Sequence, residues 1–333
     1  MKSSIPDALK ADIPQTKWGK ILTTTPVVMT VVATLLAGLA SSEMTRAQYD
    51  RSLAAQQQSK AGDQWSYFQA KRLRGAMQRC TLDILQNTTP LRPFDAVQFR
   101  KAVAAIAGTP DQGGAAAART ALLTILDSSA GQQTLELLAK GELPELPALK
   151  AADPQVERAL EAIENSRPEA EMHTLIAPIK EAALDETLRA AIGRVQSYDG
   201  MLRGHNRTID EVERLFPHAV PPPQAGKPAM DNSPARDFAA ARLHFQALRY
   251  DAESRLNQAI ANVYELQVRK SNLTAERHHT RSQRFFFGML AAQAAVIIAT
   301  FSIAAQKRNL LWSLAAAAGL AAVAFAVYVY FYN

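Results

Sequence analysis

Residues 285–304 read FFFGMLAAQAAVIIATFSIA, a run without Asp, Glu, Lys, Arg or His. Two more charge-free apolar runs occupy residues 21–40 and 310–332. A helix of about 20 apolar residues is long enough to cross the hydrocarbon core of a bilayer. The three runs therefore predict three transmembrane helices, with a long polar segment between the first and the second.

The composition indicates helices throughout. The chain of 333 residues is 48% hydrophobic and 20% charged, and most of its 15 Gly and 17 Pro fall between periodic segments. Its polar middle is rich in the helix formers Ala, Leu, Glu and Arg. We expect an all-α integral membrane protein with long membrane-emergent helices forming a coiled-coil-like stalk, and a small helical soluble domain.

The breaks in helical periodicity divide the chain. The expected parts are an N-terminal tail (1–20), a transmembrane helix (21–40), a long stalk helix (41–87), a helical soluble domain (88–216), a Pro-rich linker (217–233), a second stalk helix (234–284) and two transmembrane helices (285–304 and 310–332). Within the soluble domain we expect helices over 94–107, 115–126, 130–140, 154–165, 168–183 and 185–216. Pro residues bound the soluble domain and the linker because Pro interrupts helical hydrogen bonding. Each stalk helix, by contrast, is expected to continue directly into its span, since no Pro lies at either junction.

Each stalk helix carries an apolar stripe that predicts its buried face. On the first helix, the stripe consists of Trp65, Phe68, Leu73, Met77, Cys80 and Ile84. On the second helix, apolar residues recur every seventh position at 238, 245, 252, 259, 266 and 273. This period suits a coiled-coil seam, and the first stalk helix is its expected partner.

Basic residues near the spans predict the orientation. Lys17 and Lys20 precede the first run, and Lys307 and Arg308 form the turn between the last two. Because basic residues concentrate in short cytoplasmic loops, we favour a bacterial inner-membrane protein with a periplasmic body. Basic residues before residue 285 favour a cytoplasmic body, and that orientation stays open. The residues before Ser41 resemble a signal-peptide cleavage site, but the long polar lead favours a retained anchor.

Small residues recur at four-residue spacing in the last two spans, at Ala291, Ala295, Ala299, Ala315 and Gly319. Small residues allow helix backbones to approach closely in lipid. This pattern predicts packing against a neighbouring span or another copy, although Ala is common throughout the chain.

Residues with catalytic spacing are missing from the sequence. There is no phosphate loop, dinucleotide fingerprint, zinc-protease motif or nucleophile elbow. His278 and His279 are adjacent, so their side chains diverge around a helix and do not suit a shared metal. We expect no catalytic, cofactor-binding or metal-binding residues. The net charge of +6 lies largely beside the spans, which favours lipid and not nucleic acid as a partner.

One segment, AGDQWSYFQAK at residues 61–71, resembles the D-Q-W-x-Y-x-Q-A-K helix of a bacterial family, domain of unknown function 4337. The resemblance implies an early span, a helical middle and a terminal two-span hairpin with a basic turn, and it implies no activity. The turn at Lys307 and the following LLW at 310–312 are also similar. The candidate interaction patch comprises Gln64, Trp65, Tyr67, Phe68, Gln69 and Lys71. Packing on the long C-terminal helix is the alternative interpretation.

These observations favour a non-enzymatic, membrane-anchored scaffold or accessory subunit of an inner-membrane assembly. Its expected partners are the lipid bilayer and either further copies of the chain or other membrane subunits. The alternative is a pore or export channel built from several copies. A third possibility is an enzyme whose site lies in residues 90–233.

Overall fold

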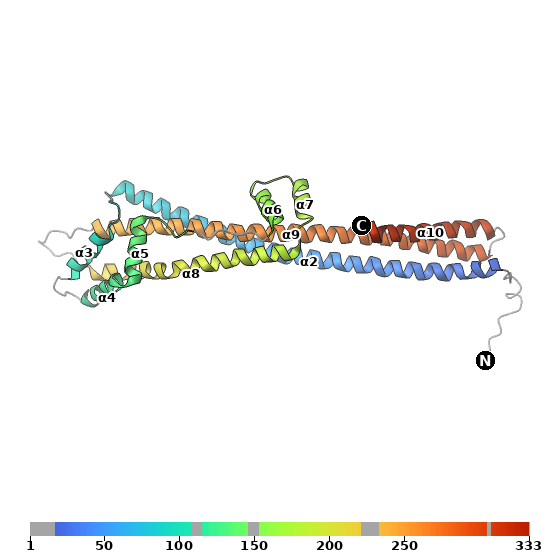
Figure 1. The fold of residues 1–333 in the computed structure, drawn as a ribbon, viewed down its shortest axis with the longest axis horizontal. Helices are drawn as coiled ribbons and strands as arrows, with labels where there is room; N and C mark the ends of the chain where they lie inside the picture. Colours follow the sequence, from blue (N-terminus) through green and yellow to red (C-terminus); the bar gives the residue numbers. More distant parts are fainter. Residues whose placement is uncertain (1–16, 108–114, 146–152, 221–232, 305–307, 333) are drawn as a thin grey trace, which may run out of the picture. The chain divides into compact units, whose positions relative to one another are not determined.

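The computed structural model describes residues 17–107, 115–145, 153–220, 233–304 and 308–332 (Figure 1). All regular structure in these ranges is α-helical, without a strand, as the composition predicts. The helices are α2 (Lys17–Thr88), α3 (Ala96–Ala107), α4 (Ala115–Asp127), α5 (Ser129–Lys140), α6 (Pro154–Glu164), α7 (Glu169–Ile176), α8 (Glu181–Ala219), α9 (Ser233–Ala304) and α10 (Arg308–Tyr332).

Local capping residues explain several helix ends. Ser128 precedes α5 and its hydroxyl accepts a hydrogen bond from the amide of Gly131. The same helix ends at Gly141, whose φ of 67° is left-handed and suits glycine. Asp153 caps α6, and Pro154 occupies the first turn, where its missing donor costs nothing.

The helix predicted over 168–183 is wrong, because it divides into α7 and the start of α8. The break falls beside Pro178, which removes a backbone donor and disfavours helical geometry in the residue before it. The helix predicted to begin at residue 185 therefore starts earlier, at Glu181.

Each stalk helix continues into its span without a break, as the sequence predicts. The transmembrane run 21–40 and the stalk 41–87 form one helix, α2, because helical hydrogen bonding continues through a change in side-chain polarity. The second stalk and second span likewise form α9. Pro217, the predicted start of the linker, lies in the last turn of α8. Linker residues 221–232, the tail before Lys17 and the 108–114 turn lie outside the described residues.

The chain divides into two compact units. Unit 1 comprises Met1–Gln56 and Val268–Asn333, and unit 2 comprises Gln57–Gln267. Both α2 and α9 contribute residues to each unit. The two units are described separately below.

Unit 1 is built from α10 and the adjacent antiparallel portions of α2 and α9. The hydroxyl of Ser282 donates to the carbonyl of Ala40 at 2.7 Å, and a Cβ at Gly288 would lie 3.4 Å from Leu36 Cδ1. Its core contains small and medium apolar side chains: Ala33, Leu36, Ala40, Phe285, Ala292, Ala322 and Val329.

The outer surface of unit 1 is also apolar. Large exposed side chains include Val27, Val28, Val31 and Leu35 of α2, Phe286, Phe287, Leu290, Ile297 and Phe301 of α9, and Leu310, Leu314, Leu320, Phe325 and Phe331 of α10. In the part of the chain that the structure describes, three helices are long and apolar enough to cross a membrane. All three contribute to unit 1.

The first core of unit 2 joins α3, α4, α5 and α8 to the beginning of α9. Phe99 is buried at its centre and stacks on Phe238, with ring centroids 4.9 Å apart. Phe216 also stacks on Phe99, with ring centroids 5.7 Å apart. The buried guanidinium of Arg119 donates to the carbonyl of Ala219 at 2.9 Å, which links α4 to the end of α8.

A second core of unit 2 lies under the short helices α6 and α7. Its buried residues are Val156, Ala159, Ala162, Met172, Ile176, Ile179, Leu184 and Leu266. Leu266 belongs to α9, so this small helical pair packs directly on the long helix (Figure 1).

Every seventh residue along α2 is buried, but the buried series is not the predicted one. The buried positions are Ala33, Ala40, Ala47, Ala54, Ala61, Gly75 and Leu82, with Phe68 partly buried. On α9 the corresponding series is Ala247, Ser254, Ala261, Val268, Ala275 and Ser282. Both series are dominated by small residues, which allow helices to approach closely.

The stripe predicted on the first stalk helix is therefore wrong from Leu73 onward. Leu73 and Met77 are 64% and 59% exposed, and Cys80 is exposed. On α9, the predicted residues Phe238, Phe245, Ala252 and Leu266 are buried, but in the two cores of unit 2. The reason is geometric: within unit 2, the surface that α2 presents to α9 contains Gly75, which permits closer approach than Leu or Met.

Candidate functional site

The candidate interaction patch lies on α2 in unit 2, and the structure divides it. The partly buried members are Gln64, Trp65, Phe68 and Lys71, and the exposed members are Tyr67 and Gln69. Trp65 and Phe68 meet edge to face, with centroids 5.4 Å apart and ring planes at 87°. This geometry is the favourable arrangement of two aromatic quadrupoles.

Lys71 connects the patch to α9. Its Nζ lies 2.5 Å from Oε2 of Glu253 and 5.5 Å from the ring centroid of Tyr250. One turn further along α2, a Cβ at Gly75 would lie 3.3 Å from Tyr250 Cβ. Lys71 thus contacts α9, three further members of the patch are partly buried, and only Tyr67 and Gln69 are fully exposed.

Lys71 belongs to a cluster of polar residues that the sequence alone does not reveal. We name Lys71, Tyr198, Asn206, Arg249 and Glu253 the central polar cluster. Arg249 Nη1 donates to Asn206 Oδ1 at 2.7 Å, and Arg249 Nε lies 3.3 Å from Glu253 Oε1. Glu253 therefore pairs with one cation from α2 and one from α9. Only its i, i+4 spacing to Arg249 was visible in the sequence.

The pKa shifts of two residues in this region favour a structural role over a role in proton transfer. Burial raises the pKa of Tyr198 to about 12, and the negative charge of Glu253 adds to the effect. Nearby, burial lowers the pKa of His205, whose Nδ1 lies 2.9 Å from the hydroxyl of Thr134. Tyr198 is therefore protonated and His205 largely neutral at pH 7. The cluster fixes α2, α8 and α9 to one another within unit 2.

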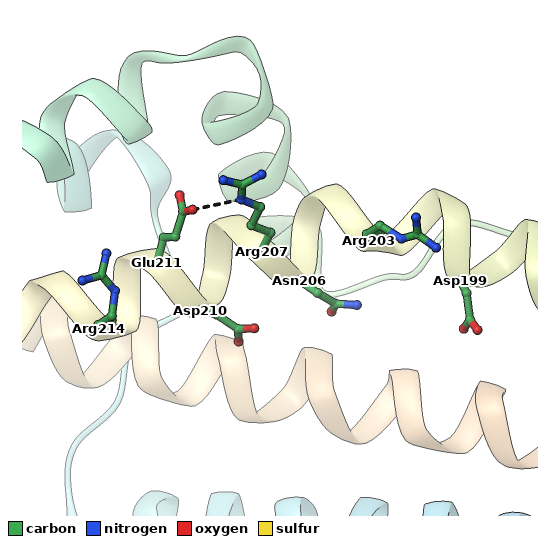
Figure 2. A pocket seen from close by; sticks show the side chains of 7 residues that line it. All are labelled: Asp199, Arg203, Asn206, Arg207, Asp210, Glu211 and Arg214. Carbon is green, nitrogen blue, oxygen red and sulfur yellow. Dashed lines mark hydrogen bonds and ion pairs between the residues drawn. The ribbon is translucent and has the colours of Figure 1, made fainter.

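A shallow pocket of about 560 Å³ lies along one face of α8 (Figure 2). Its lining residues are Asp199, Arg203, Asn206, Arg207, Asp210, Glu211 and Arg214. Arg207 Nε donates to Glu211 Oε1 at 3.0 Å, while Asp199 and Asp210 point away from that pair. Positive and negative groups alternate and do not converge, so this surface favours neither an anion nor a cation.

Unit 1 contains a second interhelical group, which we name the Glu43 cluster: Glu43, Asp50, His278 and Arg281. The buried Glu43 has Oε2 at 2.5 Å from His278 Nδ1 and Oε1 at 3.8 Å from Arg281 Nη1. Asp50 lies 3.9 Å from the other nitrogen of His278. Each ring nitrogen of His278 thus lies near one carboxylate. Among the described residues there is no group of three His, Cys, Asp or Glu suited to a metal.

The predicted packing residues of the spans lie at helix contacts in unit 1. Ala295, Ala299 and Ala315 are 0% exposed, and Ala291 is partly buried. A Cβ at Gly319 would lie 2.5 Å from Met29 Sδ, so α10 approaches α2 closely there. These small residues pack the three helices of one chain.

The predicted topology-setting residues are described only in part. Lys20 is exposed on α2. Lys17 begins α2 and Arg308 begins α10, while Lys307 lies outside the described residues.

Together, these features define an all-α protein with three helices long and apolar enough to cross a membrane. Residues 18–111 match the model of the family described as Domain of unknown function (DUF4337), which supports the resemblance to that family. The matched range contains the segment at 61–71 and extends beyond Pro90. The C-terminal hairpin lies outside it. No curated protein and no solved structure matches the chain.

Proposed function

We propose that the protein is a non-enzymatic scaffold whose unit 1 is embedded in a bacterial inner membrane. The observation that carries this proposal is the apolar outer surface of unit 1, where Phe287, Phe301 and Leu320 are among many exposed large side chains. In water, each Å² of exposed apolar surface costs about 25 cal/mol. Contiguous apolar surface of this kind is typical of contact with lipid or another protein.

The helix pair formed by α2 and α9 supports a coiled-coil-like stalk in this proposal. In unit 1, Ala40 contacts Ser282, and in unit 2 Gly75 lies against Tyr250. The burial of every seventh residue on α2 is the period expected for a left-handed supercoil. Small residues at the seam favour close packing, and the ion pairs of the two polar clusters specify the register.

A docking role is supported by the side chains that α2 leaves uncovered in unit 2. Tyr67, Leu73, Met77 and Ile84 are large exposed side chains on the part of α2 that lies in unit 2. The charges near them are largely paired, as in the central polar cluster, which favours binding over acid–base chemistry. The pore-forming alternative has less support, because a pore between copies needs a polar stripe along a span, and the polar side chains of residues 285–304 are only Gln293, Thr300 and Ser302.

Membrane insertion is tested by washing membranes with alkaline carbonate. We expect the full-length chain to stay in the membrane pellet, and release of intact protein would refute the proposal.

Orientation is tested with Cys80, the single cysteine, which is exposed in unit 2. If unit 2 is periplasmic, a membrane-impermeant maleimide labels Cys80 in intact spheroplasts. Labelling only after lysis places unit 2 in the cytoplasm.

A further inference from the structure

Gln293 of α9 is an exposed polar side chain near the middle of the apolar run 285–304. Its amide makes no hydrogen bond within the described part of the chain. The other polar side chains nearby behave differently. The hydroxyl of Thr300 donates to the carbonyl of Val296 at 2.8 Å, and that of Ser302 donates to the carbonyl of Ala299 at 2.6 Å.

An unpaired amide is costly in hydrocarbon, since lipid offers neither donors nor acceptors. This step depends on the proposed function, which places residues 285–304 within the bilayer. A glutamine carries two donor hydrogens and one acceptor oxygen. A polar side chain at this depth therefore indicates a polar partner in the membrane that the single chain does not supply.

The surface next to Gln293 suits a helix. A groove of about 440 Å³ runs between α2 and α9 in unit 1 and is lined in part by Thr30, Ala33, Thr34, Ala37 and Gln293. The four residues of α2 are small, which permits close approach of another backbone. The hydroxyls of Thr30 and Thr34 donate to carbonyls of their own helix, at 2.8 and 2.9 Å. Neither hydroxyl hydrogen therefore needs an acceptor from a docked helix.

We infer that a second copy of the chain docks on this face of α9, with Gln293 of each copy hydrogen-bonded to Gln293 of the other. Two copies insert with the same orientation, so a twofold axis along the membrane normal places identical residues at the same depth. The amide is complementary to itself because it both donates and accepts. Exposed Leu290 and Ile297 flank Gln293 on the same face. A single polar residue between apolar ones is a known determinant of register in paired helices.

Cysteine crosslinking in membranes tests this contact. In a Cys80→Ser background, Ile297→Cys is placed one turn from Gln293, and Leu320→Cys provides a matched control on α10. Both side chains are exposed in one copy, at 56% and 72%. On oxidation we expect a disulfide-linked dimer with Ile297→Cys and little with Leu320→Cys. Absence of the Ile297→Cys dimer, or equal crosslinking at both positions, would overturn the inference.

The role of the amide is tested by changing Gln293 itself. An interhelical hydrogen bond in a membrane changes association by about three- to tenfold. Gln293→Leu should therefore lower the dimer association constant in detergent by at least that factor, measured by light scattering, whereas Gln293→Asn should retain most of it. Unchanged dimerisation of Gln293→Leu contradicts the inference, as does a complex formed only with a different protein. Either of these two results would leave the proposed membrane anchoring intact, provided that the variants still resist carbonate extraction.

Discussion

Replacing Tyr198 by phenylalanine tests how unit 2 holds a buried phenol. Tyr198 of α8 is 0% exposed, and its hydroxyl has no hydrogen-bond partner among the described residues. A buried hydroxyl without a partner costs stability, since it has lost its hydrogen bonds to water. Tyr198→Phe keeps the ring and removes that hydroxyl. At pH 8 we expect the free energy of unfolding to stay the same or rise by about 1 kcal/mol.

The larger effect is expected at alkaline pH. The pKa of Tyr198 is raised from 10.0 to about 12, by burial first and by Glu253 second. Below pH 10 the phenol is protonated in both the folded and the unfolded chain. Between pH 10 and 12 only the unfolded chain releases the proton, so the folded state loses stability as pH rises. At about 1.36 kcal/mol per pH unit, this loss amounts to about 2–3 kcal/mol by pH 12.

The assay is urea unfolding of the full-length protein in detergent micelles, followed by circular dichroism at pH 8, 10, 11 and 12. Relative to the native chain, Tyr198→Phe should lose about 2–3 kcal/mol less between pH 8 and pH 12. Tyr67→Phe, at an exposed tyrosine of α2, is the control and should leave the alkaline loss unchanged. If Tyr198→Phe and the native chain lose stability equally, the reasoning about this buried phenol is refuted.

Further substitutions in unit 2 test its packing and its ion pairs, with the same unfolding assay. A Cβ at Gly131 would overlap the carbonyl oxygen of Ile125, so Gly131→Ala should destabilise the protein by about 1–3 kcal/mol. Gly200 has open space around it, so Gly200→Ala should stabilise the protein by up to about 1 kcal/mol. Equal effects would contradict this contrast. Glu253→Ala should cost about 2–3 kcal/mol because it leaves Lys71 partly buried without its carboxylate. Adding Lys71→Met should recover part of that loss, and no recovery would show that the pair is not coupled.

Features that depend on neighbouring residues could be predicted from the sequence. The three apolar runs follow from the absence of charge over a stretch long enough to span a bilayer, and they correspond to helices in the structure. Asp153 before Pro154 correctly marks the start of α6, because a cap is satisfied within one turn. The segment at 61–71 also pointed to the family whose model matches residues 18–111. In each case, the deciding interactions are local along the chain.

The tertiary structure alone decided which face of each long helix is covered. Leu73 is more apolar than Gly75, yet Leu73 is exposed and Gly75 is buried against Tyr250. Glu43 bonds to His278, which lies 235 positions away. The physical reason is that the burial of a helix face depends on how closely a distant backbone can approach. Side chains far apart in the sequence set the distance between two helices. The shifted pKa values and the unsatisfied buried groups follow from that distance.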